Sequence, residues 1–195
     1  MHKVIFLNGP PGAGKDRAAR IMMKAYPNIR HRKFSAHLKE VGAVMYQLTA
    51  AEVKEFDFDQ ASKDMPRAAL FGKSWRQTLI WLSEKVMKPE FGESYFGDML
   101  LRQMQQPTGS KITAISDSGF VKEAMPLIAE YGAPNCLIVQ LTRPGHSFDG
   151  DSRNYWTYPW VPMVSVNNLF DLPMFRVQIL SRVDKFLSFE RPNYD

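Results

Sequence analysis

Near its start the chain has an apolar, strand-like run followed by a glycine-rich turn that ends in Gly-Lys. The run Val4 to Leu7 leads into Gly9 to Lys15, which has the spacing G-x-x-x-x-G-K. Glycines at this spacing let backbone N–H groups converge on phosphate oxygens, and the lysine can reach the outer phosphates of a triphosphate. Helix formers follow, so the phosphates would lie at a helix N-terminus. The pattern predicts a phosphate loop over residues 9–15. Its expected ATP-binding residues are Gly9, Gly12, Ala13, Gly14, Lys15 and Asp16.

Two aspartates are candidates for the metal side of this site. Asp16 stands where such a loop usually has a serine or threonine that contacts Mg²⁺. A carboxylate is also a hard oxygen ligand for Mg²⁺, and a negative charge is favoured in the first turn of a helix. Asp117 ends a second strand-like run, where phosphoryl-transfer enzymes place an acid that orients the metal and its waters. We expect both to act in catalysis beside Mg²⁺, with helix capping as the structural alternative for Asp117.

Several basic residues are candidates for contacts with phosphate. Arg76 is expected to open a helix, where the helix dipole disfavours a cation, so an anion should lie nearby. That anion is either a substrate phosphate or the acidic segment before it, in which Lys63 could assist. Arg143 and Arg153 follow a later strand-like run in a glycine-containing segment. We expect Arg143 to contact the donor nucleotide and Arg153 to stabilise the transferring phosphoryl group.

Other chemically capable side chains have structural interpretations beside the functional ones. Trp156 lies among aromatic residues that can stack on a base, although aromatics before a strand more often seal a core. We keep it as a candidate for substrate contact. Cys136 lies in an apolar run and is expected to be buried, and His146 is expected to be a loop histidine.

Strand-like and helical patterns alternate along the chain. Strands are predicted at 3–7, weakly at 33–35, and at 112–116, 136–141 and 163–166; helices are predicted at 15–26, 36–48, 74–88, 94–106, 121–131 and 173–188. This order predicts an α/β fold with a parallel sheet, helices on both faces, and a ligand site beyond the carboxyl ends of the strands. Two long irregular segments interrupt it, at about 49–73 and about 143–162. We expect a substrate-holding arm and a closing lid.

The bulk composition narrows the class of protein. The chain has 195 residues, 45% of them hydrophobic, and no apolar run approaching the roughly 20 residues that span a bilayer, which predicts one soluble domain over 1–195 and no membrane partner. The start shows no leader or lipidation pattern, so we expect a cytoplasmic protein. Residues 1–48 hold nine Lys/Arg and two Asp/Glu, whereas the rest is nearly balanced. This excess around the phosphate loop suits a small polyphosphate, and nucleic acid is a minor alternative.

With these residues in view, the chain resembles the deoxynucleoside monophosphate kinases of tailed bacteriophages, within the phosphate-loop nucleoside monophosphate kinases. The resemblance covers nearly the whole length. It rests mainly on Gly14-Lys15-Asp16, on the segment from Phe34 to Glu40 and on the segment from Gly72 to Gln77. Weaker matches are Phe91-Gly92, Tyr95-Phe96, the segment from Ile115 to Phe120, Glu123, Asp151-Ser152-Arg153 and the segment from Val164 to Asn168.

The resemblance implies transfer of the ATP γ-phosphate to a deoxynucleoside monophosphate for DNA precursor synthesis, with Mg²⁺. It also implies a three-layer P-loop NTPase fold with a five-stranded parallel sheet. Ser35, Lys39 and Arg76 would lie toward the monophosphate, and Arg143 and Arg153 toward the triphosphate. Dimers are common among such kinases, so a homodimer is one option, and the location would be the host cytoplasm if a phage encodes the protein.

One position departs from the family pattern. Many relatives have Asp-x-Arg after the third strand, whereas this chain has Asp117-Ser118-Gly119. Either Arg143 or Arg153 would then have to supply the missing charge.

Two other functions compete with the monophosphate kinase. A phosphate-loop kinase could act on another acceptor, such as dephospho-coenzyme A or a polynucleotide 5′-hydroxyl, for which Asp117 could serve as a base. A regulatory module could bind ATP without turnover. The partners that we expect are small-molecule nucleotides.

Overall fold

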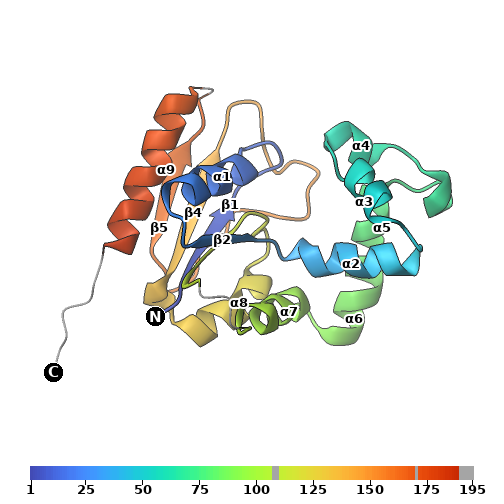
Figure 1. Ribbon diagram of the computed structural model, residues 1–195, viewed down its shortest axis with the longest axis horizontal. Coiled ribbons are helices and arrows are strands. Elements are labelled where there is room, and N and C mark those ends of the chain that lie inside the picture. Colours follow the sequence, from blue (N-terminus) through green and yellow to red (C-terminus); the bar gives the residue numbers. More distant parts are fainter. Residues whose placement is uncertain (107–109, 170, 189–195) are drawn as a thin grey trace.

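The computed structural model describes residues 1–106, 110–169 and 171–188. At its centre lies a five-stranded sheet in the order β2-β3-β1-β4-β5, in which every pairing is parallel. The strands are β1 (Lys3–Asn8), β2 (Ile29–Arg32), β3 (Ile112–Ile115), β4 (Cys136–Thr142) and β5 (Met163–Asn167). All five therefore end at the same edge of the sheet (Figure 1).

Helices cover both faces of the sheet, as predicted. On one face lie α1 (Lys15–Ala25) and α9 (Leu172–Leu187), and on the other lie α7 (Tyr95–Met104) and α8 (Val121–Tyr131), the latter followed by the short 3-10 helix η3 (Ala133–Asn135) (Figure 1). Alternate side chains of β1 point to opposite faces, as in any strand. Ile5 and Leu7 join the core under α1 and α9, and Val4 and Phe6 join the core under α7 and α8.

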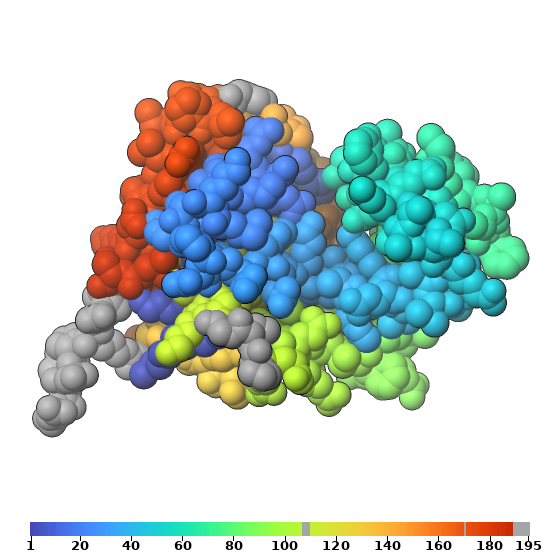
Figure 2. Space-filling model, viewed as in Figure 1, coloured from blue at the N-terminus to red at the C-terminus, as the bar shows by residue number. Residues whose placement is uncertain are grey.

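A second group of helices stands beside the sheet, at the end of α2 (Ser35–Met45) (Figures 1 and 2). The arm, residues 49–73, contains α3 (Ala50–Phe56), α4 (Gln60–Asp64) and the 3-10 helix η1 (Ala68–Leu70). After it the chain forms α5 (Trp75–Trp81), the π-helix η2 (Leu82–Met87) and α6 (Lys88–Phe91). Phe56, Leu70 and Trp75 give the arm a small core of its own.

Three differences from the sequence predictions have physical reasons. The second strand lies at 29–32 and not at 33–35, because Ile29-Arg30-His31-Arg32 forms an edge strand that buries little and so shows no apolar run. The arm, predicted to be irregular, is partly helical because Thr49 and Asp59 cap its two short helices. The helix predicted at 74–88 begins with a capping box formed by Ser74 and Gln77 but widens into a π-helix at Leu82.

Residues 143–162, all of which the structure describes, contain neither helix nor strand. We call them the lid segment. Among the described residues, none of the helices is long and apolar enough to cross a membrane.

Candidate functional site

A cavity of about 580 Å³ opens beyond the carboxyl ends of the strands, between the phosphate loop, the arm and the lid segment. Figure 2 shows the surface hollowed between the arm and the body that carries α1. Its lining contains nine Lys/Arg and five Asp/Glu, an excess of four positive charges that suits a polyanionic ligand. Predicted site residues that line it are Gly12, Gly14, Lys15, Asp16, Ser35, Lys39, Lys63, Arg76, Asp117, Arg143 and Arg153.

The phosphate loop joins the buried end of β1 to the start of α1 through tight contacts. Gly14 has φ 104°, in the region that favours glycine, and a Cβ there would lie 2.8 Å from Asn168 Nδ2. A Cβ on Gly9 would lie 2.6 Å from the Leu141 carbonyl oxygen. The buried Asn168 also donates to the Ala13 carbonyl at 3.1 Å. Neighbouring segments therefore fix the loop from behind, and Asn168 has a positioning role that the sequence did not predict.

Lys15 turns back over this loop. Its Nζ donates to the carbonyl oxygens of Gly9 at 2.5 Å and Pro10 at 2.8 Å. Burial, and then the nearby charge of Arg153, lower the pKa of Lys15 to about 8. The ammonium group is thus held inside the cavity, near the arginine predicted to act with it.

Asp16 binds residues from the ends of two other strands. Its Oδ1 accepts from Ser116 Oγ at 2.6 Å and lies 2.8 Å from Lys33 Nζ. Burial works against ionisation, but the hydrogen bonds from Lys33 and Ser116 keep the pKa of Asp16 below its usual value. The side chain is still 55% exposed, so this carboxylate can meet a ligand in the cavity.

Asp117 lines the cavity and also caps α2. Its Oδ1 accepts the backbone N–H of Phe34 at 2.8 Å, and its Oδ2 accepts that of Ser35 at 2.9 Å. The capping alternative considered for Asp117 is therefore present, but for the helix after β2 and not for the helix that follows Asp117 in sequence. The contact fixes Ser35 and the start of α2 against the end of β3.

Arg153 occupies the space that a side chain at residue 119 would need. A Cβ on Gly119 would come within 2.3 Å of Arg153 Cδ and 2.5 Å of its Cγ. Asp151 accepts from Arg153 Nε at 2.8 Å and from its Nη2 at 2.5 Å, which orients the guanidinium in a two-point contact. The hydrogen bond to Asp151 raises the pKa of Arg153, so the group is always charged. Because Gly119 has no side chain, it leaves room for the side chain of Arg153.

The start of the lid segment rests on the phosphate loop. Arg143 Nη1 donates to the Gly12 carbonyl at 2.8 Å, and His146 Nδ1 lies 2.9 Å from the Pro11 carbonyl oxygen. A Cβ on Gly12, which has φ 77°, would lie 2.3 Å from the His146 ring. Arg143 and His146 therefore both contact the phosphate loop, a contact that the sequence did not indicate for His146.

On the other side of the cavity each predicted basic residue faces an aspartate. Lys39 Nζ lies 2.5 Å and Lys63 Nζ 3.5 Å from Asp57. Arg76 donates to Asp64 at 2.6 Å and also bonds Gln60. The anion near Arg76 is thus supplied by the arm, one of the two alternatives considered from the sequence. The three cations nevertheless all line the cavity.

Trp156 does not line the cavity, contrary to the expectation that it contacts substrate. It is 8% exposed and packs edge-on against Phe6, with ring centres 5.5 Å apart. Its Nε1 donates to the Ser118 carbonyl at 3.0 Å. Its apolar ring and single donor are both satisfied in the core, which was the structural alternative for this residue. Cys136 is buried as expected, and burial raises the pKa of its thiol to about 12.

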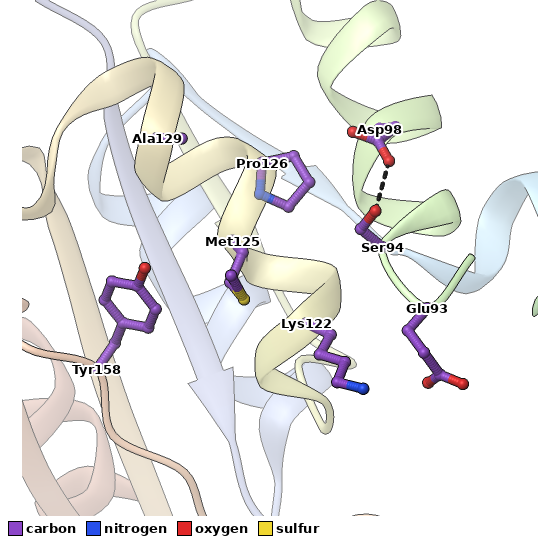
Figure 3. A pocket seen from close by; sticks show the side chains of 8 residues that line it. All are labelled: Glu93, Ser94, Asp98, Lys122, Met125, Pro126, Ala129 and Tyr158. Atoms are coloured by element: carbon purple, nitrogen blue, oxygen red, sulfur yellow. Dashed lines mark hydrogen bonds between the residues drawn. The ribbon is translucent and has the colours of Figure 1, made fainter. Parts of the chain in front are cut away.

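A second hollow, of about 480 Å³, lies between α7 and α8 with Tyr158 at its side (Figure 3). Glu93 and Lys122 stand at its rim, and on one side of it Ser94 donates to Asp98 at the start of α7. The phosphate loop and the arm contribute nothing to this hollow among the residues that line it. It is therefore separate from the candidate site.

The part of the chain that the structure describes holds no cluster of three or more His, Cys, Asp or Glu placed to bind a metal ion. A metal held by the protein alone is therefore not a feature of the described residues. Mg²⁺ commonly binds through one or two carboxylates together with phosphates and water, and Asp16 offers such a carboxylate.

Comparison with known proteins gives a likeness in structure but not in sequence. Neither a protein-family model nor a curated protein matches the chain. Protein TT1252 from Thermus thermophilus has a similar structure, with 14% identity, 97% of this chain and 100% of that chain covered, and a TM-score of 0.51. A sugar kinase from Janibacter sp. HTCC2649 (12% identity, 96% and 95% covered, TM-score 0.45) and thymidylate kinase from Candida albicans (12%, 98% and 96%, 0.44) are more distant in structure.

At these identities the likeness concerns the fold alone. The five-stranded parallel sheet, the helices on both faces and the loop between β1 and α1 make this an α/β fold of the P-loop NTPase type. The fold prediction made from the sequence is therefore confirmed.

Proposed function

We propose that the protein is an ATP-dependent kinase that transfers the γ-phosphate of ATP to a deoxynucleoside monophosphate. One observation carries the proposal: a single cavity holds two separate sets of cations. Lys15, Arg143 and Arg153 lie by the phosphate loop, and Lys39 and Arg76 lie toward the arm. Two phosphate-bearing ligands that meet end to end need this arrangement, whereas a regulatory ATP site needs only the first set.

The chemistry requires alignment more than acid–base catalysis. A monophosphate oxygen is already anionic at neutral pH, so the protein must bring two groups of like charge together and exclude water. Lys15 would hold the outer phosphates of ATP over the N-terminus of α1. Arg153, oriented by Asp151 and accommodated by Gly119, would stabilise the charge on the transferring group. Arg76 would hold the acceptor phosphate.

Mg²⁺ would enter with the triphosphate and neutralise part of its charge. Asp16 is the residue that best fits this role, because it is half-exposed at the first turn of α1. Asp117 would act beside it, while its two hydrogen bonds keep the start of α2 in place.

The first experiment is to incubate the purified protein with Mg²⁺, ATP and each common deoxynucleoside or ribonucleoside monophosphate, and to follow ADP formation. We expect release of ADP that depends on particular deoxynucleotides. If no monophosphate stimulates ADP release while ATP still binds, the acceptor is wrong. Dephospho-coenzyme A and a 5′-hydroxyl oligonucleotide, included in the same panel, then test the other kinases, and no transfer to any acceptor favours the regulatory module.

A further inference from the structure

The cavity has lining residues that the phosphate chemistry does not use. Leu38, Leu79 and Phe120 give it apolar surface. Ser83 and Glu84 add a hydroxyl and a carboxylate to the same lining. Apolar surface with a few polar groups suits a flat heterocycle with hydrogen-bonding edges.

One helical face connects several of these residues to the acceptor-phosphate position. Arg76, Leu79, Ile80, Ser83 and Glu84 all line the cavity and follow the i, i+3, i+4, i+7, i+8 spacing of a single helix face. At about 1.5 Å of rise per residue in α5, and less in the π-helix after it, Glu84 lies roughly 10 to 12 Å along the axis from Arg76. That span suits an extended mononucleotide with its phosphate at Arg76, its sugar and base along Leu79 and Ile80, and its base edge at Glu84.

Glu84 is held in place from behind by a buried lysine. Its Oε1 accepts from Lys88 Nζ at 2.8 Å and from Ser83 Oγ at 3.0 Å. The Lys88 side chain is 2% exposed, and its Nζ lies 4.0 Å from the centre of the Phe120 ring. Because both contacts use Oε1, the second carboxylate oxygen is available to accept a hydrogen bond from a ligand.

Glu123, on α8, completes the buried charge group. Its Oε1 lies 3.6 Å from Lys88 Nζ, farther than Glu84, and its side chain is 7% exposed. Burial raises the pKa of Glu123 to about 8, so this carboxyl keeps its proton at neutral pH. Lys88 is then balanced by Glu84, the nearer of the two carboxyl groups. These residues lie in or beside the π-helix Leu82–Met87, and π-helical turns are frequent at functional sites.

Resting on the proposed function, we infer that Glu84 reads the base of the acceptor, and that the preferred monophosphates carry a base with an exocyclic amino group. A carboxylate can only accept hydrogen bonds, and the amino groups of cytosine, adenine and guanine donate them. Thymine has a carbonyl oxygen where cytosine has its amino group, so a Glu84 oxygen that faces this position of the ring meets a second acceptor, which repels it. Acceptors such as dCMP, dAMP or dGMP should therefore exceed dTMP.

The test compares kcat/KM for these four monophosphates in wild type and in Glu84→Gln. We expect the best amino-bearing acceptor to exceed dTMP in the wild type, and Glu84→Gln to reduce that ratio about tenfold or more, because the amide presents a donor as well as an acceptor. Glu90→Gln is the matched control, since Glu90 is exposed on the following helix and lies outside the cavity lining. Its ratio should equal that of the wild type.

The possible results distinguish a failure of the proposed function from a failure of the role assigned to Glu84. If the wild type phosphorylates no monophosphate, the proposed function fails and this inference fails with it. If transfer occurs but dTMP is used as well as the others, or if Glu84→Gln lowers kcat/KM for all four acceptors alike, Glu84 is only a structural partner of Lys88. Should Glu84→Gln not fold, as judged by circular dichroism, Glu84→Asp keeps the charge but shortens the reach, and an unchanged ratio there also overturns the inference.

Discussion

Replacing Glu123 by glutamine should change how the stability of the protein depends on pH. Burial raises the pKa of Glu123 from 4.5 to about 8 in the folded protein, with Lys88 opposing the shift. Between these values the folded protein keeps a proton that the unfolded chain has lost. Its free energy of unfolding must then fall as the pH rises through this window.

The size of the effect follows from proton linkage. One proton corresponds to about 1.4 kcal/mol per pH unit, so about two units inside the window cost the wild type about 3 kcal/mol. Glutamine at 123 cannot titrate. The free energy of unfolding of Glu123→Gln minus that of the wild type should therefore rise by about 3 kcal/mol from about pH 5.5 to about pH 7.5.

Urea unfolding at several pH values, followed by fluorescence of the four tryptophans, measures this difference. Glu90→Gln provides the control, because the same chemical change at an exposed position should leave the difference flat across the window. A flat difference for Glu123→Gln as well would show that Glu123 is already ionised in the folded protein. The balance of charge assigned to Lys88 and Glu84 would then be wrong.

Other predictions concern the phosphate side of the cavity. Gly119→Ala puts a methyl group 2.3 Å from Arg153 Cδ and should displace the guanidinium. We expect kcat to fall about 100-fold or more with the melting temperature nearly unchanged. Wild-type turnover would show that Arg153 does not need the space beside Gly119. Lys15→Ala should lower turnover about 100- to 1,000-fold with an unaltered circular dichroism spectrum. Because the pKa of Lys15 is about 8, calorimetry should show ATP binding to weaken as the pH rises through that value, and a constant affinity would contradict the assignment. Arg76→Ala should raise the acceptor KM about tenfold or more while the ATP KM stays the same, and an unchanged acceptor KM would refute its role.

The sequence predicted the strands, helices and loops whose pattern is contained in a short stretch of neighbouring residues. Buried strands such as β1 and β4 are continuous apolar runs, and the phosphate loop is a short motif with a strand before it and a helix after it. The edge strand β2 was misplaced, because Arg30, His31 and Arg32 face outward or lie partly buried and leave no apolar pattern.

The site was predictable where spacing alone carries the chemistry, and not where distant segments meet. Lys15, Asp16 and Arg153 line the cavity as predicted, but no local pattern shows that Asn168 supports Ala13 or that Asp57 pairs with Lys39. The sequence did not show that Trp156 is buried in the core for the same reason, because its packing partner Phe6 lies 150 residues away in sequence. Such contacts exist only once the sheet has brought the strand ends together.

Several cations near the cavity are already paired with aspartates, so an anionic ligand that binds these cations must displace or share the aspartate carboxylates. Within the described residues, the pairs are Lys33 with Asp16, Lys39 and Lys63 with Asp57, Arg76 with Asp64 and Arg153 with Asp151. The binding free energy is then only the difference between the attraction of the cation to the ligand and its attraction to the carboxylate. A monovalent ion such as chloride is attracted to the cation no more strongly than the carboxylate is. A dianionic phosphate carries more charge than the carboxylate and is attracted more strongly. On the proposed function, a phosphate that takes Lys39 and Arg76 from Asp57 and Asp64 would break ion pairs that tie the arm to α2 and α5.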